Sequence, residues 1–155
     1  MELTGSLQEY LKTMYILKNT EDEIRVTDVA RRIGCSKPSV NKALKNLNEL
    51  NLIEYERYGD IKFTTEGEET AKDIIRKYSL LKLFLTEVLE IEKDIAEEEA
   101  KSMKHAISEE TSEKLEKYIN KILNLEDLDC NYDVTNKRCR CCEKVTSKYQ
   151  FKDNE

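Results

Sequence analysis

The sequence predicts a mostly α-helical protein in which an N-terminal winged helix-turn-helix is followed by an α-helical dimerisation domain. Apolar residues recur at helical spacing from Leu7 to Leu125. The spacing changes to the strand period of two only after Asn51, and one proline and four glycines interrupt the 155 residues. We therefore expect a DNA-binding domain over residues 1–64, a dimerisation domain over 65–126 and a cysteine-rich segment over 127–155.

Three helices and a hairpin are expected in the first domain. The first helix covers residues 7–17 with Ser6 as its N-cap, and a short second helix opens at Thr27 and ends at Gly34. A third helix begins at Ser36 and carries Pro38 in its first turn, where proline is tolerated. Residues 53–65 then alternate between apolar and polar around a turn, which predicts the wing.

The second domain is predicted to be helical over residues 65–88, 95–106 and 108–123. Thr65 and Glu68 have the spacing of a capping box, and Ser108 is suited to cap the last helix. The long apolar stripe of the first of these helices must be buried against something, and a second copy of the chain is the expected partner. The pattern therefore predicts a homodimer.

Charge is distributed unevenly along the chain, whose net charge is −6. Residues 25–46 contain six Lys or Arg and one acid, whereas residues 87–113 contain ten acids and three lysines. The basic segment coincides with the predicted helix-turn-helix, whose second helix enters the major groove of DNA. We predict DNA contacts from Ser36, Lys37, Pro38, Ser39, Asn41 and Lys42 on that helix, and from Arg57 and Lys62 on the wing. Asn41 is suited to a base edge and Lys42 to phosphate.

Four segments carry a resemblance through their order and spacing: LQEYLKTMYIL, VTDVARRIGCSKPSVNKALKNLNELNLI, IKFTTEGEETAKDIIRKYSLLKLFL and HAIS. Over roughly residues 6–124 the chain resembles the diphtheria-toxin-repressor family of metal-dependent transcriptional repressors, especially its short manganese-regulator branch. The resemblance implies a homodimer with two winged helices on a palindromic operator. It also implies that an iron or manganese ion binds between the winged domain and the dimerisation helices and raises the affinity for DNA.

The metal site that the resemblance implies is only partly present. Glu9 and His105 match family ligands, and with Glu97, at an ancillary position, they form a candidate site for manganese or ferrous iron. The remaining ligand positions hold Tyr78, Lys82, Lys101 and Lys104. Ammonium groups repel a divalent ion, so an alternative is that Lys101 or Lys104 pairs with Glu9 or Glu97 and replaces the metal.

Cysteines gather near the end of the chain. Cys130, Cys139, Cys141 and Cys142 lie within thirteen residues of each other, while Cys35 stands apart and is expected to be buried. The chain has no secretory signal and no apolar run of the ~20 residues that span a membrane, so we expect a cytoplasmic protein, in which such a cluster is rarely a disulfide framework. Four thiolates bind zinc or an iron–sulfur cluster; redox-reactive thiols and an inert tail are the alternatives.

These features predict a metal- or redox-responsive transcriptional regulator, a repressor of metal homeostasis whose effector is sensed by the C-terminal cysteines. Its cofactor is expected to be a transition metal (iron, zinc or manganese) or an iron–sulfur cluster. An enzyme is disfavoured, because the chain has one histidine and no phosphate-binding glycine loop. The alternative is a metal-handling or assembly protein that does not bind DNA specifically.

Overall fold

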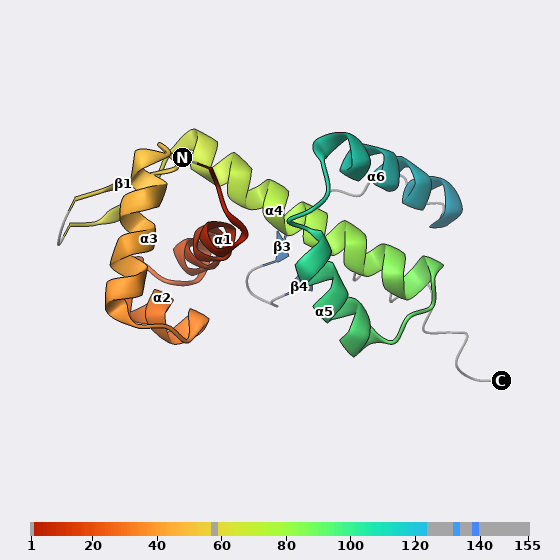
Figure 1. Cartoon of the computed structure of the whole chain (residues 1–155), viewed down its shortest axis with the longest axis horizontal. Coiled ribbons are helices and arrows are strands. Elements are labelled where there is room, and N and C mark those ends of the chain that lie inside the picture. The colour runs from red at the N-terminus through yellow and green to blue at the C-terminus, as the bar shows by residue number, and fades with distance from the viewer. Residues whose placement is uncertain (1, 57–58, 124–131, 134–137, 140–155) are drawn as a thin grey trace. The chain divides into compact units, whose positions relative to one another are not determined.

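The computed structural model describes residues 2–56, 59–123, 132–133 and 138–139 (Figure 1). The chain divides into two compact units, Met1–Ile74 and Ile75–Glu155. Most described residues are helical, as predicted, and strands are confined to two short antiparallel pairs. No helix in the described ranges is both long and apolar enough to cross a membrane.

The first unit consists of three helices, a two-stranded wing and the start of a fourth helix. These are α1 (Gly5–Thr20), α2 (Val26–Ile33), α3 (Lys37–Glu49), β1 (Ile53–Tyr55), β2 (Ile61–Phe63) and the first turns of α4 (Thr65–Leu83). In the wing, Ile53 lies opposite Phe63 and Tyr55 lies opposite Ile61. The winged helix-turn-helix is therefore confirmed, with strands shorter than the alternation suggested.

One apolar core fixes this arrangement. The residues of this core with at most 1% of their surface exposed come from the first three helices, the wing and α4: Leu11, Met14, Val29, Val40, Leu44, Leu47, Ile53 and Ala71. Each of these buried side chains larger than alanine contributes roughly 1.5–3 kcal/mol by leaving water. Val40, Leu44 and Leu47 form the buried stripe of α3, so the opposite face of that helix is left for solvent or a ligand.

The helix ends of the first unit differ in part from the prediction. The Leu7 N–H donates to Thr4 Oγ1 at 3.4 Å, so Thr4 rather than Ser6 caps α1, which begins at Gly5. Helix α2 begins one residue before Thr27 and has no side-chain cap. Its end was predicted correctly, because Gly34 takes a left-handed conformation with φ of 79°.

The start of α3 agrees with the prediction and the start of α4 does not. The Ser39 N–H donates to Ser36 Oγ at 3.4 Å, and Pro38 lies in the first turn of α3. At α4 the cap is Thr64, whose Oγ1 accepts the Gly67 N–H at 3.0 Å. The predicted capping box of Thr65 and Glu68 is wrong, because the Glu68 carboxylate forms an ion pair with Lys18.

The second unit is also mainly helical. Beyond the rest of α4 it contains a π-helical turn η1 (Phe84–Val88), α5 (Lys93–Met103), α6 (Glu109–Leu123), β3 (Tyr132–Asp133) and β4 (Arg138–Cys139). The long predicted helix thus ends in a wider turn, and β3 pairs with β4 where no strand was expected. Ser108 caps α6 as predicted, since the Thr111 N–H donates to Ser108 Oγ at 3.2 Å. A separate core forms around Leu81, Leu85, Ala96 and Ala100.

Candidate nucleic-acid interface and metal position

Helix α3 has one buried and one exposed face. The six residues predicted from the sequence as DNA contacts of this helix are all exposed and lie at its N-cap and in its first two turns: Ser36, Lys37, Pro38, Ser39, Asn41 and Lys42. Lys62, predicted on the wing, is exposed on β2, and Arg57 lies outside the described residues. The exposed part of α3 is therefore short, polar and basic, which suits a helix that enters the major groove.

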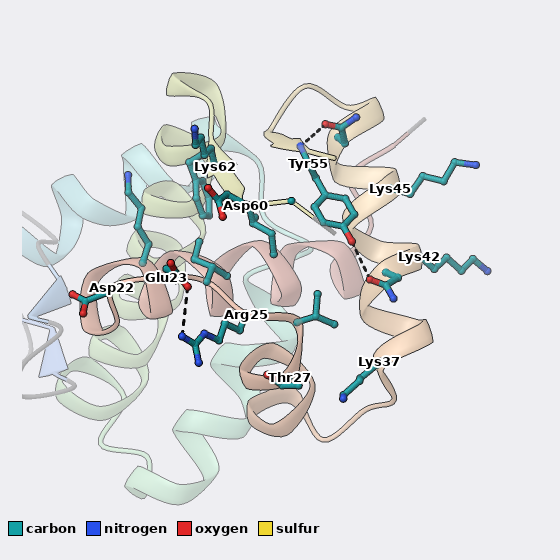
Figure 2. A pocket seen from close by; sticks show the side chains of 18 residues that line it. Asp22, Glu23, Arg25, Thr27, Lys37, Lys42, Lys45, Tyr55, Asp60 and Lys62 are labelled. Atoms are coloured by element: carbon teal, nitrogen blue, oxygen red, sulfur yellow. Dashed lines mark hydrogen bonds and ion pairs between the residues drawn. The ribbon is translucent and has the colours of Figure 1, made fainter. Parts of the chain in front are cut away.

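An open groove of the first unit runs between α3, the wing and the segment that follows α1 (Figure 2). Its lining contains the acids Asp22, Glu23 and Asp60 and the cations Lys18, Arg25, Lys37, Lys42, Lys45 and Lys62. Glu23 is paired with Arg25 at 3.5 Å. The excess of positive charge gives this side of the unit the polarity that attracts a phosphate backbone. Lys45, one turn beyond Lys42, was not among the predicted contacts.

Tyr55 connects the wing to α3. Its backbone N–H donates to Asn48 Oδ1 at 3.0 Å, and its hydroxyl donates to Asn41 Oδ1 at 3.2 Å (Figure 2). A side-chain amide has one carbonyl oxygen and one NH2 group. A hydrogen bond to the oxygen of Asn41 therefore fixes the oxygen towards Tyr55 and turns the NH2 group away from it. Sequence reasoning missed Tyr55. The available signal was an aromatic residue on the first strand of a hairpin that follows a recognition helix.

Cys35, in the turn between α2 and α3, is half-buried and accepts a hydrogen bond from the Tyr10 hydroxyl at 3.4 Å. This hydrogen bond raises the pKa of Tyr10, and burial of the hydroxyl raises it further to a smaller extent. The thiol packs against the core of the first unit. It was expected to be buried, and its contacts are those of a packing residue.

In the second unit, four of the residues at the family's ligand positions contact one another in two pairs. Lys82 Nζ on α4 lies 2.8 Å from Glu97 Oε1 on α5, so Lys82 rather than Lys101 forms this ion pair. Lys101 Nζ lies 2.8 Å from Glu98 Oε1. Lys104 Nζ lies 5.6 Å from the centre of the Tyr78 ring, and only 3% of this lysine is exposed.

Glu97 lies in a strongly cationic environment. The hydrogen bond from Lys82 lowers the pKa of Glu97, and the charges of Lys82, Lys93 and Lys101 lower it further, against the effect of partial burial. The hydrogen bond to Glu98 raises the pKa of Lys101. A divalent ion at Glu97 would have to displace one ammonium group and approach two others. In the first unit, Glu9 Oε2 is paired with Lys12 Nζ at 2.7 Å.

The donors in the described part of the chain do not fit a bound metal. No three or more His, Cys, Asp or Glu side chains in the described ranges form a group that could hold an ion. Glu97 and His105 are the only predicted donors in the second unit's α5 region, and lysines and a tyrosine accompany them. Cys130, Cys141 and Cys142 lie outside the described residues, and Cys139 ends β4. The cysteine site therefore stays a prediction.

A winged helix-turn-helix with a basic recognition helix, followed by a separate helical unit, defines the class of winged-helix transcription regulators. Two sequence models of one family match the chain in that order. Residues 2–61 match the N-terminal DNA-binding domain of iron-dependent repressors, and residues 64–124 match their metal-binding and dimerisation domain. The chain therefore belongs to the iron-dependent repressor family, which is the diphtheria-toxin-repressor family that its motifs resemble.

Individual relatives agree with this assignment. The chain is 32% identical to an uncharacterized HTH-type transcriptional regulator of Methanocaldococcus jannaschii over 120 residues, which are 77% of this chain and 96% of that protein. It is 34% identical to the transcriptional regulator MntR of Escherichia coli O157:H7, over 68% of this chain and 67% of the relative.

Solved structures are similar in fold. The manganese regulator SloR aligns with a TM-score of 0.65 and 28% identity, over 74% of this chain and 53% of that one. A hypothetical protein of Sulfolobus solfataricus aligns with a TM-score of 0.64 at 22% identity, over 77% and 91% of the two chains. This chain thus spans about half the length of the SloR structure and nearly all of the Sulfolobus protein.

Proposed function

We propose that this protein is a cytoplasmic, metal- or redox-responsive repressor of metal homeostasis that binds a palindromic operator as a homodimer and is not an enzyme. The observation that carries the proposal is the exposed, basic N-terminal half of α3 beside a groove with six cations and three acids. Membership of a family with a DNA-binding domain and a dimerisation domain supports it independently.

Each part of the first unit has a role in this proposal. Asn41 reads a base edge in the major groove, because its side-chain NH2 group can donate to an acceptor on a base. Lys37, Lys42 and Lys45 contact phosphates on either side of the groove. Ser36 and Ser39, hydrogen-bonded to each other at 2.9 Å, place the N-terminus of α3 against a phosphate. Lys62, and Arg57 from the same wing, contact the neighbouring backbone.

Dimerisation is assigned to the second unit. Large apolar side chains remain exposed there, each with more than a third of its surface in solvent: Leu89, Ile95, Met103, Tyr118 and Ile122. Exposed apolar side chains at this density favour association over a monomer in water. A symmetric dimer places two recognition helices about one turn of DNA apart, which explains a palindromic operator.

For the effector we propose the thiols of Cys130, Cys139, Cys141 and Cys142, binding a transition metal or an iron–sulfur cluster. Two considerations support this choice: the second unit has lysines where metal donors are needed, and four clustered thiolates form a soft binding site. The alternative within the same class is a weak site for manganese or iron made by Glu9, Glu97 and His105.

The first experiment is selection of duplexes from a random pool by the purified full-length protein, followed by salt titration of the enriched duplex. We expect a palindromic sequence, two chains per duplex, and an affinity that falls steeply as salt rises, because cations of α3 and the wing displace counterions. Absence of sequence enrichment, with retained metal binding, would instead favour the metal-handling or assembly protein.

A further inference from the structure

One charged side chain is buried in the second unit. Of the described side chains that are buried and polar, Thr13, Ser79 and Ser112 are neutral, and Lys104 is the only one that carries a charge. An ammonium group leaves water only where its surroundings compensate for the lost hydration. Lys104 is therefore held by specific interactions and is not a solvated surface lysine.

On one side of Lys104 lies an aromatic ring, whose π-electrons attract the ammonium group. Its ammonium lies 5.6 Å from the centre of the Tyr78 ring, inside the range of about 6 Å for a cation–π interaction. Tyr78 belongs to α4, while Lys104 directly follows the last residue of α5. This contact thus joins the end of α5 to the C-terminal part of α4.

A second cationic link joins the same two helices. Lys82, one turn after Tyr78 on α4, is paired with Glu97 on α5 at 2.8 Å. The Lys82 side chain is 23% exposed and the Glu97 side chain is 31% exposed. Lys93 and Lys101 add further positive charge around Glu97. Two lysines, one from each helix, therefore connect α4 with α5.

These links lie in the part of the chain that matches a metal-binding domain. Residues 64–124 contain one histidine and no cysteine, and their described side chains form no group that could hold an ion. A bound ion would supply positive charge in this region. Here two lysines of the chain supply it, Lys82 beside the Glu97 carboxylate and Lys104 beside the Tyr78 ring. The chain thus matches a metal-binding domain, but in its described part positively charged lysines stand where metal donors are expected.

We propose that the ammonium groups of Lys82 and Lys104 replace the divalent ion in the dimerisation half, so that α4 and α5 are linked in their working arrangement without metal. The inference rests on the proposed function, since its consequence is that manganese does not activate operator binding. It concerns the second unit only, and is independent of any metal at the C-terminal cysteines.

The decisive measurement is a manganese titration of the wild-type protein, because Mn2+ prefers oxygen and nitrogen donors to thiolates. We expect no loss of the free Mn2+ electron paramagnetic resonance signal, and less than about a twofold change in affinity for the selected duplex at millimolar Mn2+. Stoichiometric Mn2+ binding with tenfold tighter operator binding, abolished in Glu9→Ala, would overturn the inference. Failure to bind any duplex would instead count against the proposed function.

Variants of Lys104 test the structural part. Lys104→Met keeps the aliphatic stem and removes the charge, whereas Lys104→Arg keeps the charge. We expect the methionine variant to melt at a lower temperature and to dimerise more weakly, and the arginine variant to recover both. Lys101→Met is the matched control, because half of the Lys101 side chain is exposed. A methionine variant as stable and as dimeric as wild type would contradict the inference, since an apolar group would then serve equally well.

A gain of function completes the test. Lys82→Glu combined with Lys104→Glu converts the two cations named in the proposal to donors, and we expect Mn2+ to bind and to raise operator affinity in that variant. Lys114→Glu with Lys121→Glu makes the same change of charge on α6 and should gain no response. Circular dichroism before titration establishes that the double variants are folded. A folded first variant that remains unresponsive would contradict the proposed equivalence of lysines and metal.

Discussion

In the proposed interface, Asn41 and Tyr55 are the residues on which sequence reading by α3 depends most. The Tyr55 hydroxyl holds Asn41 Oδ1 at 3.2 Å, which leaves the amide NH2 group to donate to a base. Asn41 is the residue predicted to read a base, and its orientation is set by a hydrogen bond from the wing and not by α3 itself. In the proposed interface, the wing therefore contributes to specificity by orienting Asn41 and not by touching a base.

Two substitutions separate base reading from its orientation. Asn41→Ala should reduce discrimination at one base pair by about 1–3 kcal/mol, the value of a good amide–base contact. Tyr55→Phe retains the ring and removes only the hydroxyl, and we expect a loss of about 0.5–1.5 kcal/mol at the same base pair. Binding to a panel of duplexes, each with one substituted base pair, measures both.

Lys42→Ala provides the control for these substitutions, because a phosphate contact should weaken all duplexes to a similar extent. The double variant Asn41→Ala/Tyr55→Phe should discriminate no worse than Asn41→Ala alone, since the hydroxyl acts through Asn41. If Tyr55→Phe changes discrimination at a different base pair, or adds fully to Asn41→Ala, then Tyr55 contacts DNA itself.

Gly67 is a second residue whose role depends on distant backbone. A Cβ added there would overlap the carbonyl oxygen of Leu52, which lies before the wing. Leu52 O also accepts the Thr64 N–H at 3.2 Å, so this close approach fastens the start of α4 to the start of the wing. Glycine is required here by contact and not by backbone conformation.

Gly67→Ala should therefore destabilise the first unit. In an exposed helix the substitution stabilises by up to about 1 kcal/mol, but here the backbone must shift, and we expect a loss of roughly 1–3 kcal/mol. Urea unfolding followed by circular dichroism measures the change, with Glu66→Ala, at an exposed neighbouring position, as the control. Equal stability of the two variants would show that α4 moves away from Leu52 without penalty.

At the scale of helices and strands, the ion pair between Lys82 and Glu97 should make the second unit sensitive to acid. The folded protein lowers the pKa of Glu97, chiefly through the hydrogen bond from Lys82. Stability from this pair is therefore fully present above the ordinary glutamate pKa and is lost as pH falls through the lower folded value.

Glu97→Gln should consequently destabilise the protein by up to about 1 kcal/mol near neutral pH, and the difference from wild type should vanish as pH falls below the lowered folded pKa of Glu97. Thermal unfolding at a series of pH values provides the measurement. Glu113→Gln, on the exposed side of α6, serves as the control and should change little at any pH. A Glu97→Gln deficit that persists unchanged at acid pH would show that the carboxylate charge is not its cause.

The elements differ in how far the sequence determines them. Apolar spacing located the six α-helices of the described residues within a few residues, because each buries one stripe against a core. Helix starts were less certain where hydroxyl residues crowd together. Thr64 rather than Thr65 caps α4 because its Oγ1 also donates to Asn51 O at 2.8 Å, a contact thirteen residues away. No local pattern contains that contact.

In the candidate interface, too, features set by local spacing could be predicted from the sequence, and contacts between distant residues could not. The exposed set on α3 was predictable, because residues opposite a buried helical stripe must face outwards. The Tyr55–Asn41 and Lys82–Glu97 contacts join residues fourteen and fifteen positions apart on different elements. They depend on how those elements pack, so sequence spacing could identify a lysine at a metal position but not the carboxylate that pairs with it.

At the scale of the whole molecule, each unit contains one segment with a strong charge bias, and the two segments have opposite signs. Basic residues dominate 25–46 in the first unit, and acidic residues dominate 87–113 in the second, within a net charge of −6. A phosphate backbone is attracted by the first bias and repelled by the second. This distribution agrees with the family assignment, in which the first unit matches a DNA-binding domain and the second a metal-binding and dimerisation domain.

The last prediction concerns how a signal reaches the operator. If α4 and α5 are already linked by lysines, a metal or redox effector must act elsewhere in the chain, and the four clustered cysteines are the available donors. A ligand there couples to DNA binding only if it favours one placement of the two recognition helices, whose spacing must match one turn of DNA.

We expect a variant with Cys139, Cys141 and Cys142 changed to Ser to lose both bound metal and regulated operator binding, because a tetrahedral centre with one remaining thiolate is not retained. Wild type and variant are purified without oxygen, loaded with iron or zinc, and compared by elemental analysis, visible absorption and operator affinity. Cys35→Ser is the matched control, since it removes a thiol that packs within the first unit. Unchanged metal content and unchanged regulation in the triple variant would exclude the cysteines as the sensor and return the search to Glu9, Glu97 and His105.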